Sequence, residues 1–357
     1  MVELRVAGSR PGGSGRVDRP PTIGYYVHHQ GLGHLHRAGA IAAFLPAATT
    51  VLSSLPAPHP PMPWVGLPMD DLTRPADHTA HGTLHWVPRH DQGLRRRMAL
   101  VADWIDRTDP DLMVVDVSVE IAVMSRLMGV PTVVMAMPGD RSDRAHRSAY
   151  DSAHAILAPW AAEFSADQWS NPWPDKTFHA GAISRYAGRT PVRPVARERP
   201  SRVLVLWGRG GEPLPDGFLD AASRATPGWS WRQAGPEGGV PVWDQLAWAD
   251  VVVTHGGQNS IAEVAAARRP AVVMAQSRPH GEQAATVATL HRAGLAVGLH
   301  AVPDPARWPD LLAGALSLGG DRWARWAPGN APRRAADFLL ETAIEVRDVG
   351  TAREPTA

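Results

Sequence analysis

Short apolar runs, each about the length of one buried strand, alternate with longer segments of helical composition along the chain. In the first half, the strand-like runs are Ile23–Val27, Thr50–Leu55, Leu112–Val115 and Thr132–Met137. The segments of helical composition there are Leu35–Leu45, Leu94–Arg107 and Val119–Met128. Strands that alternate with helices predict an α/β fold built on doubly wound parallel sheets.

Chain length and one proline-rich segment indicate two domains. A chain of 357 residues is too long for a typical single domain and fits two of ordinary size. Residues 191–200 are polar and proline-rich, as in a linker, and a new strand-like run begins at Arg202. We therefore expect a disordered tail over 1–21, an N-terminal domain over 22–190, the linker over 191–200, a C-terminal domain over 201–334 and a final helix over 335–348.

The composition excludes several classes of function. A formal net charge of +1 gives no electrostatic basis for general nucleic-acid binding. The absence of cysteine excludes thiolate catalysis and cysteine-based zinc sites, and it fits a cytoplasmic protein. No segment approaches the roughly 18 to 20 apolar residues of a membrane span, and residues 1–21 lack the apolar core of a signal peptide. The run Arg95–Arg97 is expected on a solvated helix face, with peripheral contact to an anionic membrane surface as the alternative.

The segment from His255 to Gln283 has the pattern of a phosphate site. An apolar strand run, Val251–Thr254, leads into His255 and two glycines, then a polar cluster, and then the helical segment Ile261–Ala267. Free backbone N–H groups and the positive end of the helix dipole converge on an anion in such an arrangement. The alternative is that Asn259 or Ser260 only caps the helix.

The spacing within this segment resembles the donor-binding signature of nucleotide-sugar glycosyltransferases. These two-domain enzymes include plant, macrolide and glucuronosyl transferases and are related to the peptidoglycan lipid N-acetylglucosaminyl transferases. The matching positions are His255, Gly257, Asn259, Ser260, Glu263, Pro270, Glu282 and Gln283. The resemblance implies the GT-B architecture, in which two Rossmann-like domains face each other across a cleft. It implies a nucleotide-diphosphate sugar as co-substrate and no other cofactor.

The resemblance also implies roles for individual residues. His255, Asn259 and Ser260 would contact the diphosphate, and Glu263 would accept hydrogen bonds from the ribose hydroxyls. Glu282 and Gln283 would face the sugar hydroxyls; without the upstream motif they would be taken as solvated. Arg209, in a second glycine loop, would neutralise the leaving diphosphate or else lie exposed. The complete donor set expected is Gly33, Arg209, Val242, His255, Gly256, Gly257, Gln258, Asn259, Ser260, Glu263, Glu282 and Gln283.

A glycine loop after the first strand, residues 31–34, resembles the acceptor-side loop of the same enzymes. The resemblance assigns the general base to His34, whose unperturbed pKa of about 6.5 suits that role. Asp116 follows the strand run Leu112–Val115, and we expect it to orient this histidine because parallel strand ends meet at one sheet edge. The alternative is that Asp116 caps the next helix; Glu120 is the reserve carboxylate.

The N-terminal half is rich in histidine, but it has no H-E-x-x-H or comparable metal-ligand pattern. We expect no metal, as the resemblance also implies. Most of the other histidines in this half are expected in loops or at the surface; they are His28, His29, His36, His78, His81, His85 and His90.

The chain departs from the family pattern at the base and sugar positions. Gly239, Pro241 and Val242 stand where relatives carry a base-stacking tryptophan and a Pro-Gln pair, and Trp243 is out of register. Uridine is therefore only a default base. Ala275 replaces a family proline, so the sugar is also open.

These observations favour an inverting, metal-independent glycosyltransferase that moves a sugar from a nucleotide-diphosphate sugar, UDP-sugar by default, to a hydroxyl acceptor. One alternative is a nucleotide-sugar hydrolase or epimerase of the same fold, because Gly33–Arg37 resembles a subset that hydrolyses nucleotide sugars or uses lipid-linked acceptors. Another is a non-catalytic nucleotide-sugar-binding scaffold. The acceptor stays open between a natural product, a lipid and a glycan. Residues 56–90 are rich in proline and histidine, so we expect them to form loops that help to shape its pocket.

Overall fold

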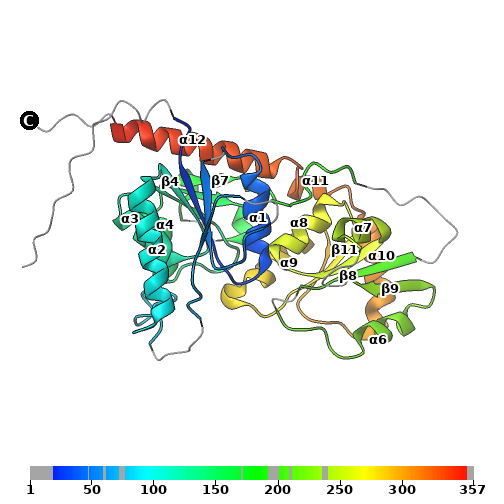
Figure 1. The fold of residues 1–357 in the computed structure, drawn as a ribbon. Coiled ribbons are helices and arrows are strands. Elements are labelled where there is room, and N and C mark those ends of the chain that lie inside the picture. The colour runs from blue at the N-terminus through cyan, green and yellow to red at the C-terminus, as the bar shows by residue number, and fades with distance from the viewer. Residues whose placement is uncertain are drawn as a thin grey trace, which may run out of the picture.

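The computed structural model describes residues 19–46, 48–58, 62–71, 77–169, 172–191, 201–208, 211–234 and 240–351. Within them the chain forms two parallel sheets, each covered by helices on both faces, that lie side by side (Figure 1). The expected α/β class and the doubly wound parallel sheets are confirmed. The expected tail lies outside the described residues except for 19–21, and the expected linker except for 191.

The first sheet has seven parallel strands in the order β3-β2-β1-β4-β5-β6-β7. They are β1 (Ile23–Val27), β2 (Thr49–Ser53), β3 (Trp64–Gly66), β4 (Leu112–Asp116), β5 (Thr132–Met135), β6 (Ala155–Ala158) and β7 (Thr177–His179). The helices between them are α1 (Leu32–Ala42), α2 (Gln92–Thr108), α3 (Val119–Leu127), α4 (Arg144–Ser152) and α5 (Ser165–Gln168), with 3₁₀ turns η1 (Ala162–Phe164) and η2 (Pro174–Lys176).

The second sheet has five parallel strands in the order β12-β11-β10-β8-β9. They are β8 (Ser201–Leu206), β9 (Trp229–Gln233), β10 (Val251–His255), β11 (Ala271–Met274) and β12 (Val297–Leu299). The accompanying helices are α6 (Phe218–Ala225), α7 (Val242–Trp248), α8 (Gln258–Ala266), α9 (Glu282–Arg292), α10 (Trp308–Leu318), α11 (Trp323–Trp326) and α12 (Ala331–Thr351), with 3₁₀ turns η3 (Pro279–Gly281) and η4 (Pro305–Arg307).

Each sheet has one point at which the strand order reverses direction. In the first sheet β1 lies between β2 and β4, and in the second β8 lies between β9 and β10. Doubly wound sheets bind ligands outside the carboxyl ends of the strands at such a point. Helices α1 and α8, which follow β1 and β10, contact each other between the two sheets (Figure 1). The topology therefore places the two candidate ligand sites opposite one another.

The final helix, α12, packs on the N-terminal sheet although it follows the C-terminal domain in sequence (red in Figure 1). Leu339 is fully buried in one core with β1 and α1. Phe338 stacks on Phe178 of β7, with ring centroids 4.4 Å apart. Arg334 donates to the carbonyl oxygens of His179 and Ala180. This helix therefore connects the two domains a second time.

Some local expectations differ from the structure. Helix α1 begins at Leu32, so Gly33 and His34 lie in its first turn rather than in a loop; only Gly31, with φ of +92°, has a backbone that favours glycine. The segment 56–90, expected as loops, contains β3. Arg97 is 2% exposed and not solvated, because Asp70 and the Tyr26 hydroxyl pair with it inside the domain.

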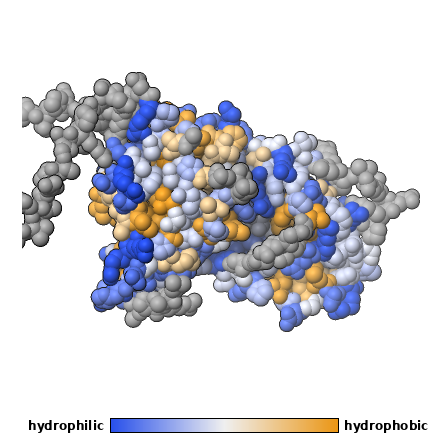
Figure 2. All heavy atoms as spheres, in the orientation of Figure 1, coloured by the Kyte–Doolittle hydropathy of each residue, from blue (hydrophilic) through white to orange (hydrophobic). Residues whose placement is uncertain are grey.

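In the described part of the chain, no helix is both long and apolar enough to cross a bilayer. Figure 2 shows hydrophilic and hydrophobic residues intermixed over both domains on the face drawn.

Leu339→Ala should lower the free energy of unfolding by about 2 to 5 kcal/mol, because it leaves a cavity between α12 and the sheet. Ile344→Ala, on the exposed side of the same helix, should change it by less than about 0.5 kcal/mol. Denaturant unfolding followed by circular dichroism measures both. Equal effects of the two variants would contradict the described packing of α12.

Candidate active site

A histidine–aspartate pair lies at the point where the strand order of the first sheet reverses (the first switch point). His34, in the first turn of α1, has Nδ1 3.0 Å from Oδ1 of Asp116, the last residue of β4. A carboxylate only accepts hydrogen bonds, and the Arg37 nitrogen that also lies 3.0 Å from Nδ1 donates to Asp116 Oδ1, so we assign the proton to Nδ1. That tautomer leaves Nε2 of His34 with a free lone pair. The pair expected from the sequence is thus brought together, and its chemistry fits a general base with an orienting carboxylate.

Arg37, one turn after His34, completes this cluster and was missed as a site residue by the sequence analysis. Its Nε donates to Asp116 Oδ2 at 2.9 Å, and a terminal nitrogen donates to Oδ1 at 2.5 Å. Its other terminal nitrogen donates to Gln258 Oε1 of the C-terminal domain at 2.8 Å. The i, i+3 spacing from His34 on a helix was the available signal. Arg37 therefore links the His34–Asp116 pair to helix α8.

Asp116 is fully buried, and its charge is held by its neighbours. Burial raises the pKa of this carboxyl, but the Arg37 guanidinium and His34 outweigh it and place the pKa well below its usual range. Asp116 is therefore ionised at neutral pH and able to stabilise an imidazolium on His34.

Asp116 does not cap the helix that follows it. Ser118 is the N-cap of α3 and accepts from the Ile121 amide, so the capping alternative is wrong. Val117, between the two, has φ of +63°, a strained conformation for a β-branched residue. Such strain is found where the surroundings fix a functional geometry.

Glu120, the reserve carboxylate, has a different place. Its Oε1 accepts from the backbone amides of His85 and Trp86, and its Oε2 from the Ser118 hydroxyl. It therefore holds the loop that carries His85 rather than the His34 ring.

The second switch point leaves a helix N-terminus open. The N-cap of α8 is Gly257, which has no side chain to bond the first-turn amides. Asn259 and Ser260 lie inside the first turn, so the reading that one of them caps the helix is wrong. Free first-turn amides and the helix dipole make this end an anion site.

His255, at the end of β10, borders this N-terminus as a neutral donor. Its Nδ1 accepts from the Gly257 amide at 3.0 Å, which leaves the proton on Nε2, 3.3 Å from the Ser260 hydroxyl. Burial, with Arg278 nearby, lowers the pKa of His255 to about 4. The two glycines matter because a Cβ on Gly256 or Gly257 would crowd Gln283 or the His255 ring.

Helices α1 and α8 approach closely at Gly33. A Cβ built on Gly33 would lie 2.4 Å from the side-chain nitrogen of Asn259, so a larger residue there would displace that side chain. With the Arg37–Gln258 hydrogen bond, this close approach places the His34 cluster beside the N-terminus of α8. The structure thus brings Gly33, His34, Asp116, Gln258, Asn259 and Ser260 to one region.

Two acidic residues expected at the donor site are paired across the cleft. Glu263 Oε1 lies 2.8 Å from Arg185 Nε, and Glu282 Oε2 lies 3.1 Å from Arg141. Burial raises the pKa of Glu263, and Arg185 opposes that rise. Both arginines come from the N-terminal domain, so the two carboxylates were expected as free acceptors but are ion-paired.

Two of the three remaining donor-set residues lie in the described part of the chain. Gln283 is 2% exposed: its amide oxygen accepts from the Gln276 amide, and its amide nitrogen donates to Gln276 Oε1 and lies 3.5 Å from His255 Nδ1, so in this structure it joins the loop after β11 to His255. Val242 begins α7 and packs against the core. Arg209 lies outside the described residues.

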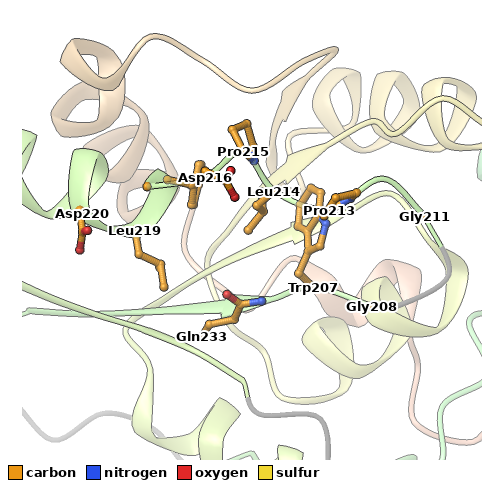
Figure 3. A pocket seen from close by; sticks show the side chains of 12 residues that line it. Trp207, Gly208, Gly211, Pro213, Leu214, Pro215, Asp216, Leu219, Asp220 and Gln233 are labelled. Carbon is orange, nitrogen blue, oxygen red and sulfur yellow. The ribbon is translucent and has the colours of Figure 1, made fainter.

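A pocket of about 580 Å³ lies at the carboxyl ends of β8 and β9. Figure 3 shows the side chains of Trp207 and Gln233, from the ends of β8 and β9, at its border. The Trp207 ring lies 5.5 Å from the His255 ring, edge to face. The volume of the pocket falls within the roughly 300–1,000 Å³ of small-molecule sites. Sequence analysis did not single out Trp207, because it belongs to no motif and reaches the pocket only by following the end of strand β8.

The structure also gathers four metal-ligating side chains that the sequence pattern did not connect. One potential ligand atom from each of His85, Asp143, His146 and His280 lies within 4.8 Å of the other three. They come from three segments and both domains, which is why no local motif revealed them.

Comparison with solved structures identifies the fold. A glycosyltransferase of kitacinnamycin superposes with a TM-score of 0.64 at 17% identity, over 91% of this chain and 99% of that chain. MurG of Acinetobacter baumannii gives 0.62 at 12% identity, over 90% and 99%. The chain has the GT-B fold. The architecture expected from the sequence is therefore confirmed.

A family model agrees with this fold in the C-terminal domain. Residues 242–302 match the glycosyltransferase family 28 C-terminal domain, and they include α8 and the glycine turn before it. The GT-B spinosyn rhamnosyltransferase SpnG complexed with thymidine diphosphate superposes with a TM-score of 0.51 at 16% identity, over 92% of this chain and all of that chain. None of the curated proteins compared matches the sequence.

The depressed pKa of His255 predicts a specific loss of stability in acid. An unfolded histidine titrates near 6.5, so below that pH the unfolded chain binds a proton that the buried ring does not. Stability falls as the pH drops from about 6.5 towards about 4.

His255→Asn should therefore lose about 1 kcal/mol less than wild type between pH 7.5 and pH 5.5 in denaturant unfolding. His81→Asn, at a side chain 86% exposed, should follow wild type. A His255→Asn curve parallel to wild type would show that His255 is not held neutral.

Proposed function

We propose that this protein is a glycosyltransferase that moves a sugar from a nucleotide-diphosphate sugar to a hydroxyl acceptor. The observation that carries the proposal is the contact between the His34–Asp116 pair and the open N-terminus of α8 through Arg37 and Gln258. A proton acceptor and an anion site beside each other are what nucleophilic displacement of a nucleoside diphosphate requires. The GT-B fold and the family 28 match support the same reaction.

In this mechanism the acceptor hydroxyl donates its proton to His34 Nε2 as its oxygen attacks the anomeric carbon. The Asp116 carboxylate stabilises the imidazolium that forms and fixes the tautomer through Nδ1. Attack from the face opposite the leaving group inverts the anomeric configuration. The step uses only side chains of this chain, so we propose that it proceeds without a metal.

The diphosphate leaves towards the N-terminus of α8. First-turn amides of α8 and the protonated Nε2 of His255 would donate to its oxygens, which stabilises the charge that develops. The heterocyclic base of the nucleotide would occupy the pocket bordered by Trp207 and Gln233, where the Trp207 indole offers a stacking face. Glu263, one turn further along α8, would exchange Arg185 for the ribose hydroxyls.

Donor binding is tested by the melting temperature with uridine, thymidine, guanosine, adenosine and cytidine diphosphates. One of them should stabilise the protein by about 2.7 kcal/mol at one hundred times its Kd, by mass action. The shift should shrink in Glu263→Ala and persist in Glu341→Ala, an exposed glutamate on α12. No shift with any diphosphate would overturn the proposal.

Catalysis is tested by release of nucleoside diphosphate from that donor with a panel of hydroxyl acceptors. His34→Ala should lower the rate by roughly 100-fold or more, since loss of a general base costs about that much. His81→Ala should not change it.

A rate that is independent of acceptor would identify a hydrolase instead. Donor binding without any release would identify a non-catalytic scaffold. A His34→Ala rate within a few-fold of wild type would refute the assigned base.

A further inference from the structure

Three histidines surround one carboxylate at the contact between the two domains. Asp143 Oδ1 lies 3.2 Å from His85 Nε2, and Asp143 Oδ2 lies 2.5 Å from His146 Nδ1. His280 Nδ1 lies 3.8 Å from the same Oδ2. The His146 ring centroid lies 4.3 Å from that of His85 and 4.7 Å from that of His280. Four ligand-type atoms therefore converge on one point.

Each member of this cluster is fixed by backbone interactions. Asp143 is the N-cap of α4 and accepts from the His146 amide at 3.0 Å. Glu120 holds the His85 amide at 2.8 Å. His280 has φ of +62°, and its carbonyl accepts from the Asp140 amide at 2.9 Å. This strained conformation turns a C-terminal-domain histidine towards three N-terminal-domain groups.

The donor set suits a divalent transition metal. Imidazole nitrogen and carboxylate oxygen are ligands of Zn²⁺, and four of them meet the number that a closed tetrahedral site uses. Metal binding requires neutral histidines and an ionised carboxylate.

We propose that His85, Asp143, His146 and His280 bind one divalent transition-metal ion, with Zn²⁺ the best match, that ties the two domains together. Zn–N bonds of about 2.0 to 2.1 Å require these side chains to close around the ion by roughly an ångström. Arg141 lies beside the cluster: one of its terminal nitrogens is 3.3 Å from His146 Nε2, and the other donates to Glu282 and to the Pro138 carbonyl, so Glu282 partly neutralises its charge. The proposal does not depend on the transferase reaction.

The ion would hold the two domains in position and would take no part in the transfer of the sugar. Glu282 follows His280 by two residues, and its partner Arg141 precedes Asp143 by two. A metal that joins these two segments would fix the Arg141–Glu282 pair at the edge of the proposed donor site. Opening of the cleft would then require loss of the His280 ligand.

The test is titration of tag-free, chelator-treated full-length protein with ZnSO₄ by isothermal calorimetry, without nucleotide. Wild type should bind one equivalent. His85→Ala and His280→Gly should each weaken binding by more than the roughly 10- to 100-fold that loss of an outer-shell partner costs. Glycine at 280 accepts the left-handed backbone, so that variant removes the ligand without new strain. His81→Ala, outside the cluster, should bind like wild type.

A second readout separates metal binding from misfolding. Zn²⁺ should raise the melting temperature of wild type and His81→Ala but not of His280→Gly, while a nucleoside diphosphate should stabilise all three. Absence of one-to-one binding in wild type, or equal affinity in wild type and His85→Ala, would overturn the proposal and leave a hydrogen-bonded histidine cluster. Either result leaves the donor-site proposal unaffected, because that is measured with nucleotide alone.

Discussion

The buried charge pair between Asp116 and Arg37 is the interaction on which the proposed site depends. Neither charge is stable alone at that depth, since removal of one partner of a buried pair costs about 3 to 5 kcal/mol. Each therefore fixes the other: Asp116 ends β4, and Arg37 lies on α1 after the neighbouring strand β1. The same guanidinium reaches Gln258 on the opposite domain. The Asp116–Arg37 salt bridge thus sets the position of the His34 ring, and Arg37 connects this cluster to helix α8.

Charges across the rest of the cleft are paired in the same way. Arg185 and Arg141 of the N-terminal domain hold Glu263 and Glu282 of the C-terminal domain. If a nucleotide sugar bound to these carboxylates, its hydroxyls would replace the arginines as hydrogen-bond donors, and the carboxylates would not be unpaired before binding. The cost of that exchange favours a donor whose hydroxyls match both residues, and this is a physical basis for selectivity.

The two sheets and the place of Asp116 were predicted from local patterns: an apolar run for a strand, and a polar residue at its carboxyl end. His34 was singled out because its glycine loop resembles that of the glycosyltransferases. Arg37 was not identified as a site residue: its spacing from His34 puts both on one helix face, but its contact with Asp116 depends on how α1 packs beside β4. The sequence did not predict that the Gln283 amide bonds Gln276 in the loop after β11, because that contact depends on how the loop folds back. His85, Asp143, His146 and His280 could not be connected from sequence, since their contact depends on how two domains meet. Strands and the polar residues at their ends could be predicted, but the contacts that the fold creates within and between domains could not.

A crystal structure with the nucleoside diphosphate that stabilises the protein tests the central claim most directly. The account predicts that the terminal phosphate accepts hydrogen bonds from first-turn amides of α8 and that His34 Nε2 faces the same cavity while Nδ1 stays on Asp116. A diphosphate bound away from the N-terminus of α8, or a His34 ring that points away from the bound phosphate, would contradict it.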